Sequence, residues 1–259
     1  MPRLVDGAGR VAIAARMLAM DLLRRRVTLL LLFVVPALFD AIVFATTASR
    51  PVDVLVAALG RTSALDNRQL TLVFMGGAAV SFLTCFLGFN LVHKRRDVDA
   101  RLVLAGFRAH ELLTAKLVVL LSLVALLAVY ETAMLYLCFA PRHVLGVGCG
   151  LLLGGLVYGS LGFAVGAIFT RELEAIFVIV LLTNVDVGWL QNPIYYATSE
   201  RRGLIENLPG HYPTQLAIVS AFTDEAASSA ALHSLACAAA ALAAALLAFA
   251  LRVHLPRRS

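Results

Sequence analysis

Six apolar runs, each long enough to cross a membrane as a helix, most constrain what this chain can fold into. A bilayer core of about 30 Å needs roughly 20 apolar residues in a helix. The runs use more than half of the 259 residues, which leaves no stretch for a soluble domain of ordinary size. We therefore predict an all-α membrane protein with six transmembrane helices, at about 27–47, 70–92, 112–139, 144–170, 173–190 and 228–253.

The first run follows Arg24, Arg25 and Arg26 and could be mistaken for a secretory signal. The apolar part of a signal is only about 7–15 residues long, and this run is longer. We expect it to remain as a span. The low charged fraction of 15%, against about 25% in soluble domains, supports the same class of protein.

The basic residues predict the orientation of the chain. With both termini in the cytoplasm, sixteen of the 22 Lys and Arg residues lie inside and six lie outside. Cytoplasmic loops of membrane proteins carry such an excess. Anionic lipid headgroups would meet most of the net charge of +6, so the charge gives no reason to expect a nucleic-acid partner.

Residues 8–26 have the pattern of an amphipathic helix. Apolar residues recur at helical spacing at Val11, Ala15, Leu18 and Leu22. We predict a helix lying in the inner membrane interface, because the stripe lasts more than three turns. The alternative is a basic flank that only reinforces the topology.

The connection 93–111 is basic but also contains apolar residues. Val98, Leu102 and Ala105 follow helical spacing, and Gly106 fits the position just past a helix end. We predict a short amphipathic helix at about 96–105. A polybasic loop held by anionic lipid would explain the Lys and Arg residues but leaves the apolar stripe without a role.

Three other segments differ in how much they predict. The connection 48–69 carries no clear secondary-structure signal. The segment 191–227 is apolar and punctuated by prolines, which favours short re-entrant helices that dip into the outer leaflet or cap the bundle. The fourth run holds eight of the 18 glycines, and their small-xxx-small spacing predicts close helix packing, with hinge motion as an alternative.

Five polar residues lie within the predicted spans. Such groups are costly in a membrane and usually face a bundle interior or water. We consider them candidates for a translocation path or gate, and interhelical hydrogen bonding is the alternative. The five residues are Asp40, Asn90, Glu131, Asn184 and Asp186.

No motif for enzymatic chemistry is present in the sequence. A P-loop of the form G-x-x-x-x-G-K-[ST] is absent, as are H-E-x-x-H and G-x-S-x-G. No two of the six histidines are three or four residues apart, so no helical metal pair exists. We therefore expect no catalytic residues, no bound cofactor and no metal on this chain.

The order of these features resembles the permease subunit of an ABC-2-type transporter. The similarity rests on the amphipathic start, the six spans, the stretch "LVLAGFRAHELLTAKL" at 102–117 and "ENLPGHYP" at 206–213. It covers residues 10–253. The chain differs from some members in lacking a fused ATPase half and in its short first outer loop.

The resemblance implies that 93–111 carries a coupling helix that docks on a separate ABC ATPase subunit. The implied coupling residues are Arg95, Arg96, Asp97, Arg101, Leu102, Phe107, Arg108 and Glu111. ATP and Mg would be bound by two copies of the partner, and a second permease subunit, identical or related, would complete the transporter. The expected activity is export of a hydrophobic or amphipathic substrate, such as a drug, lipid or peptide, across a bacterial inner membrane.

Two other classes of function are open from the residues alone. An intramembrane enzyme acting on lipid or peptide could use Glu131 and Asp186. A channel or structural scaffold would need neither a partner nor nucleotide.

Overall fold

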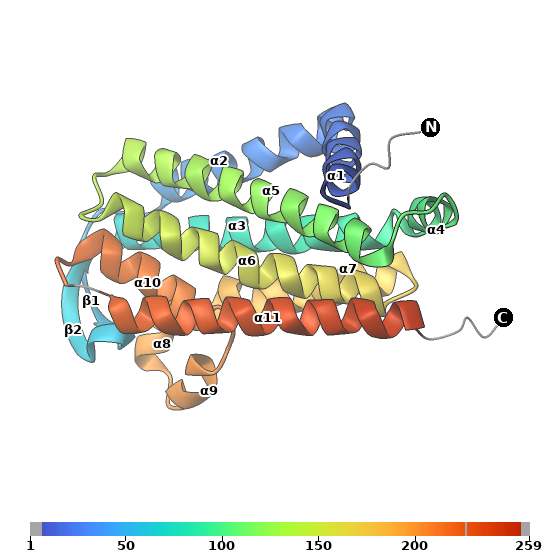
Figure 1. Ribbon diagram of the computed structural model, residues 1–259. Helices are drawn as coiled ribbons and strands as arrows, with labels where there is room; N and C mark the ends of the chain where they lie inside the picture. The colour runs from blue at the N-terminus through green and yellow to red at the C-terminus, as the bar shows by residue number, and fades with distance from the viewer. Residues whose placement is uncertain (1–6, 226, 255–259) are drawn as a thin grey trace.

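The apolar runs form helices because a chain in lipid must pair its own backbone N–H and C=O groups. The computed structural model describes residues 7–225 and 227–254. Within these residues six helices are long and apolar enough to cross a membrane, which confirms the predicted fold class. Five are single helices (Figure 1): α2 (Arg26–Thr46), α3 (Asn67–His93), α5 (Ala109–Cys138), α6 (Val144–Ile168) and α11 (Ser228–His254). The fifth along the chain joins α7 (Glu172–Thr183) to a wider π-helical segment, η2 (Asn184–Leu190).

Shorter elements gather at the two ends of the bundle (Figure 1). One end carries α1 (Gly7–Arg24), which crosses the long helices, together with α4 (Arg96–Leu104) and the last turns of α11. We name this the α1–α4 end. The opposite end, the hairpin end, carries β1 (Pro51–Val56), η1 (Ala57–Leu59), β2 (Arg61–Asp66), α8 (Pro193–Thr198) and α9 (Arg202–Glu206). Beside them, α10 (His211–Phe222) packs against α6 and α3.

The connection 48–69 forms a β-hairpin that the sequence did not predict. Its strands pair antiparallel from Pro51 opposite Asp66 to Val56 opposite Arg61. In β1 the burial alternates, so that Val54 and Val56 are buried while Asp53 is exposed and Leu55 is only partly buried. Each strand has only six residues, too few for the alternation to stand out from the apolar runs around it.

The glycines of α6 allow close contacts with the backbone of α3, as their spacing predicted. The backbone carbonyl of Cys85 on α3 occupies the space that a Cβ at Gly162 would need. In the same way, a Cβ at Gly88 on α3 would overlap the carbonyl of Gly159. The two backbones therefore touch without side chains between them, and α6 forms the centre of the bundle between α3, α5, α10 and α11.

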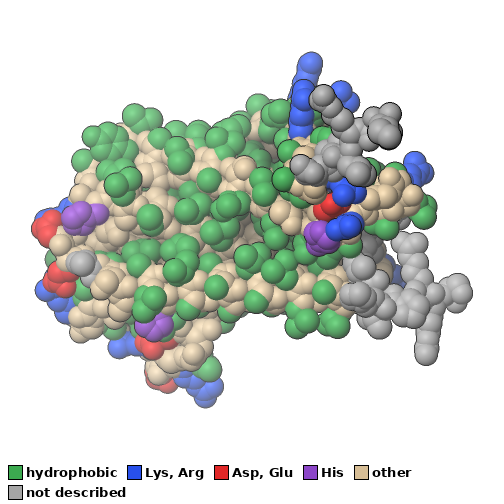
Figure 2. Space-filling model, viewed as in Figure 1, with side chains coloured by type: hydrophobic (Ala, Val, Ile, Leu, Met, Phe, Trp, Pro, Cys, Tyr) green, Lys and Arg blue, Asp and Glu red, His purple; other side chains and the backbone are tan. Residues whose placement is uncertain are grey.

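Hydrophobic side chains cover the middle of the face shown in Figure 2, and charged side chains gather at its two ends. The outward sides of the long helices are apolar, for example at Leu38 on α2, Phe177 on α7 and Leu247 on α11. In water such a surface would drive aggregation, whereas in a bilayer it meets acyl chains. The exposed apolar surface therefore agrees with the six spans.

Candidate functional site

The end of α4 is fixed by a glycine turn. Gly106 has a φ of +95°, a left-handed conformation that glycine adopts without a steric penalty. The N–H of Gly106 donates to Val103 and the N–H of Phe107 donates to Leu102, both at 3.0 Å. These two bonds form the Schellman motif that satisfies the last carbonyls of a helix. The helix and its glycine stop lie where the sequence predicted them.

The apolar residues of this region face two ways. Leu102 and Phe107 pack inward, against a core built by α1, α5 and neighbouring helices. Val98 and Val103 point outward and are 46% and 48% exposed, and Leu104 is 88% exposed. The predicted stripe of Val98, Leu102 and Ala105 therefore does not form one buried face, and the outward apolar surface is Val98, Val103 and Leu104.

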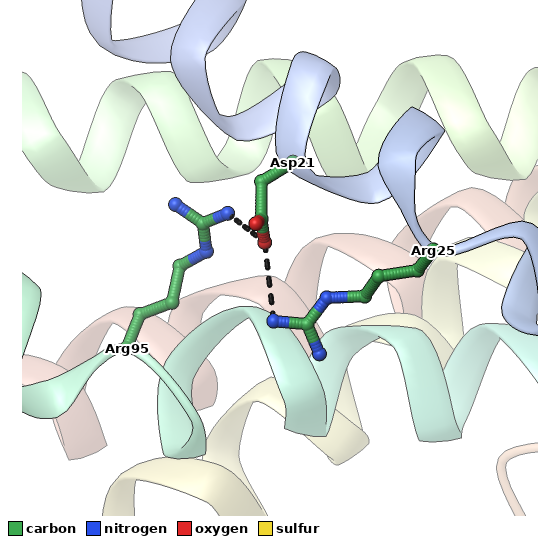
Figure 3. Close-up of polar contacts among 3 residues, drawn as sticks. All are labelled: Asp21, Arg25 and Arg95. Carbon is green, nitrogen blue, oxygen red and sulfur yellow. Dashed lines mark hydrogen bonds and ion pairs between the residues drawn. The ribbon is translucent and has the colours of Figure 1, made fainter.

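Asp21 on α1 holds the start of α4 through an ion pair (Figure 3). Its Oδ2 atom lies 2.5 Å from Nη2 of Arg95 and 3.1 Å from Nη2 of Arg25. Burial tends to raise the pKa of Asp21, but the positive charges of Arg95 and Arg25 outweigh this and hold the pKa below its usual range. Asp21 is thus ionised at neutral pH and ties α1 to the segment that leads into α4.

Glu111 ties α1 to the start of α5. Its buried carboxylate accepts a hydrogen bond from the backbone N–H of Arg108 at 2.9 Å, which caps the helix. The other oxygen lies 3.3 Å from Nε of Arg10, and Arg10 also donates to the carbonyl of Gly106 at 3.3 Å. Three elements, α1, the turn after α4 and α5, therefore meet at one carboxylate.

Lys116 joins α4 to α5 and α11. Its side chain is buried, forms an ion pair with Asp99 of α4, and lies 5.8 Å from the ring centroid of Phe249 on α11. The sequence analysis counted Lys116 among the inside charges and included it in the motif at 102–117, but it predicted no contact for this side chain. A lysine placed one turn inside an apolar run, with an acidic residue in the preceding helix, was the available signal.

The predicted coupling residues therefore divide into two groups. The first group attaches α4 to the rest of the chain and consists of Arg95, Leu102, Phe107 and Glu111. The second group is exposed and consists of Arg101 and Arg108. The side chains of Arg96 and Asp97 lie outside the described part of the structure. The result is a short helix with a fixed position and an outward surface that is both apolar and basic.

Among the polar residues of the spans, the structure brings Asp40 and Glu131 together. Their side chains interact directly between α2 and α5, and both carboxyl groups are buried. The Glu131 carboxyl also lies against Gly76 on α3, in the space that a Cβ would fill. Two carboxyl groups from different spans therefore occupy one site, which the sequence could not indicate.

The two asparagines are not part of that site. Asn90 donates to the carbonyl of Phe86 in its own helix at 2.9 Å. Asn184 is exposed on the outside of the bundle and donates to Val180 at 2.9 Å. Each side chain satisfies its donor within one turn, so neither joins another polar residue of the spans.

Asp186 is the centre of a separate polar cluster near the hairpin end. Its carboxylate accepts hydrogen bonds from the hydroxyl of Tyr158, from Nε2 of Gln191 at 2.8 Å and from the N–H of Gly210 at 3.0 Å. Gln191 in turn lies 3.1 Å from Nδ1 of His211, whose pKa is lowered by burial. The cluster fastens the fifth span to α6 and to the start of α10. Glu131 and Asp186 thus belong to different clusters and do not form one site.

No family model matches the chain, and no curated protein matches it. The resemblance to the ABC-2 permeases remains a prediction from the sequence motifs. The six apolar helices and the apolar outer surface nevertheless establish the general class. The chain is a multi-pass helical membrane protein.

Proposed function

We propose that the chain is the permease subunit of an ATP-driven ABC transporter of the ABC-2 type, which exports a hydrophobic or amphipathic substrate. The observation that carries the proposal is α4. It is a short helix at the more basic end of the bundle, and its residues Val98, Val103 and Leu104 are exposed. An apolar surface in that position favours a protein partner, because the described chain does not cover it.

The attachments of α4 support a mechanical role. Three ion pairs connect the α4 region to α1 and α5: Asp21 with Arg95, Glu111 with Arg10, and Lys116 with Asp99. Lys116 also contacts α11. A push on α4 would therefore move spans, since every one of these contacts ends on a long helix or on α1. A loop that only connects two spans would need none of them.

The arrangement of charge supports a cytoplasmic location of the α1–α4 end. This end carries most of the described Lys and Arg side chains, and the positive-inside rule then puts both ends of the chain in the cytoplasm. The ATPase partner, with its ATP and Mg, would bind there, and this chain itself would hold no cofactor. We infer a bacterial inner membrane and an assembly of two permease and two ATPase subunits.

ATP binding would drive transport only if the partner binds the two states of the permease unequally. The proposed cycle swings two six-helix bundles between inward-facing and outward-facing states, and α4 transmits the difference. The permease itself has no step of ATP chemistry in this scheme.

Replacing Leu104 by Asp tests the proposal. Leu104→Asp should leave folding unchanged, because the residue makes little contact with its own chain, and should reduce ATPase binding at least tenfold, since a desolvated charge in an interface costs several kcal/mol. Leu204→Asp is the matched control, because Leu204 is 65% exposed at the opposite end of the bundle. Binding would be measured by copurification of ATP-hydrolysing activity with the tagged chain from membranes.

Equal ATPase activity with Leu104→Asp, Leu204→Asp and the unchanged chain would remove the coupling role of α4. Hydrolysis of lipid or peptide by the purified chain alone would favour the intramembrane enzyme instead. Ion currents from the isolated chain without nucleotide would favour a channel. Leu102 and Phe107 are poorer test positions, because they pack inward and a charge there would disturb the fold.

A further inference from the structure

The carboxyl pair of Asp40 and Glu131 is enclosed by three spans. Asp40 is 2% exposed on α2, and Glu131 is 0% exposed on α5. Gly76 on α3 forms the third side, and its missing side chain leaves the room that the Glu131 carboxyl occupies. Glu131 stands seven residues before the end of α5, so the pair lies about 10 Å inside the hairpin end of that helix.

The surroundings offer these carboxyl groups no donor. In the described part of the chain, all four carboxyl oxygens are buried and lack a hydrogen-bond partner. Two other titratable groups that interact with the pair are Tyr130 and Cys138, both on α5. Tyr130 uses its hydroxyl elsewhere, donating to the carbonyl of Phe33 at 3.0 Å. The side that α3 presents is Gly76, which has no charge or proton to offer.

Two ionised carboxylates in this position would repel each other and would have lost their hydration without any compensation. A proton bound to either carboxyl group removes this repulsion. The protonated group becomes a donor, and the other carboxyl beside it becomes an acceptor. The direct contact between the two side chains is then a hydrogen bond instead of a repulsion.

We propose that Asp40 and Glu131 form a proton-binding site between α2 and α5, in which the carboxyl of one donates the bound proton to the other. The ligand is a proton and not a metal ion. A metal ion would need further ligands, and the described residues contain no group of three or more His, Cys, Asp or Glu side chains that could supply them.

The position on α2 gives this proton a route to exchange. Of the six spans, α2 is the least buried within the bundle. It contains Pro36 one turn before Asp40, and the proline removes the backbone hydrogen bond to the carbonyl of Leu32. A movement of α2 away from α5 at this proline would open the site toward the nearby hairpin end and admit water. The proton would then leave or enter as a hydrated ion.

Infrared difference spectroscopy of the full chain in lipid nanodiscs tests the proposal, and because it needs no partner it is independent of the proposed function. The unchanged chain should show the carbonyl band of a protonated carboxylic acid at neutral pH. The band should shift in D₂O and fade reversibly as the pH is raised. The paired substitution Asp40→Asn with Glu131→Gln should abolish it, because the amides keep the shape and cannot ionise.

Asp53→Asn with Glu200→Gln is the matched control, since both of these residues are exposed at the hairpin end, and it should leave the band intact. Asp186→Asn identifies any contribution from the other buried carboxyl. If the paired variant does not fold, ¹³C-labelled aspartate and glutamate identify the band as that of a carboxylic acid, and the single variants Asp40→Asn and Glu131→Gln assign it to the pair. Absence of the band at every pH, or its persistence in the paired variant, would overturn the proposal. A band that neither shifts in D₂O nor responds to pH would also overturn it, because the proton would then be a fixed part of the fold.

Discussion

Gly76 and Gly77 are neighbours on α3 with different surroundings. A Cβ at Gly76 would overlap the carboxyl group of Glu131, whereas a Cβ at Gly77 would meet only a methyl group of Leu151 at 3.7 Å. The same added methyl group would therefore clash at Gly76 and make only an ordinary contact at Gly77. This contrast makes the glycine pair a local probe of the carboxyl site.

We predict that Gly76→Ala lowers the free energy of unfolding by about 2 kcal/mol, because it forces the buried carboxyl out of its place. Gly77→Ala should stay within about 0.5 kcal/mol of the unchanged chain. Reversible denaturation of the two variants in mixed detergent micelles measures both values. Equal losses at the two positions would show that the Glu131 side chain moves freely, against the close fit described above.

The pairing of Asp40 with Glu131 also shows what residue patterns leave out. Each residue was recognisable in the sequence as a costly polar group within a span. Which of the five polar residues meet depends on how α2, α3 and α5 pack, and that information is tertiary. Asn90 and Asn184 have the same pattern in sequence, yet each bonds only to its own helix.

At the scale of single elements, the glycine turn after α4 determines where that helix stops. Gly106 and Gly203 both have open space where a Cβ would be, but only Gly106 has a positive φ. We predict that Gly106→Ala costs about 1 kcal/mol through backbone strain alone. Gly203→Ala, which adds the same group without the strain, should cost less than half of that. Unfolding measurements on the pair separate conformation from packing, and a similar cost at both would contradict the strain.

The attachment of α1 should depend on pH. Because the folded pKa of Asp21 is lowered, its ion pair with Arg95 contributes stability at neutral pH and loses it as the pH falls through that lowered value, below the ordinary Asp pKa of about 4. Acid should therefore loosen α1 before the buried helices unfold. A spin label at the exposed residue Met17 would report this as increased mobility.

The variant Arg95→Gln should show the loosened α1 already at neutral pH, since it removes the nearest positive charge from Asp21. Arg24→Gln is the control, because Arg24 is an exposed residue of the same helix. If α1 became mobile in neither variant, the ion pair would not be what attaches it.

The longer the residue pattern of an element, the more clearly the sequence predicted that element. The six apolar runs are long, so their helices were clear, and α4 was marked by Gly106. The hairpin was missed, because the alternation of Val52, Val54 and Val56 covers only one short strand. Which side of α4 faces outward was also not predictable, since Leu102 and Leu104 have the same chemistry and differ only in what packs against them.

For the molecule as a whole, the two ends differ in charge and in structure. The α1–α4 end has the ion-paired helices, and the hairpin end has the β-hairpin with α8 and α9. If the charge difference sets the orientation, Arg101→Cys should react with a membrane-impermeant maleimide only when the cytoplasmic side is accessible. Glu200→Cys should react from outside in intact cells. Both residues are exposed, and the four native cysteines would first be replaced by serine.

Labelling of both positions from the same side would contradict a membrane-spanning arrangement with opposite ends. The reverse pattern would leave the spans in place and invert the chain. Ordinary cell fractionation would not distinguish these outcomes, so the side-specific reagent is essential.

The contact between α3 and α6, where carbonyl groups stand in place of side chains, limits how this bundle can move. Sliding α3 along α6 by one residue would bring a side chain of α6 such as Leu161 against the Cys85 backbone, which now lies against Gly162. The close backbone contact therefore opposes such a step. We therefore expect α3 and α6 to move together as one rigid unit. A change of shape would then be a rotation of other helices, above all α2, around the α3–α6 pair.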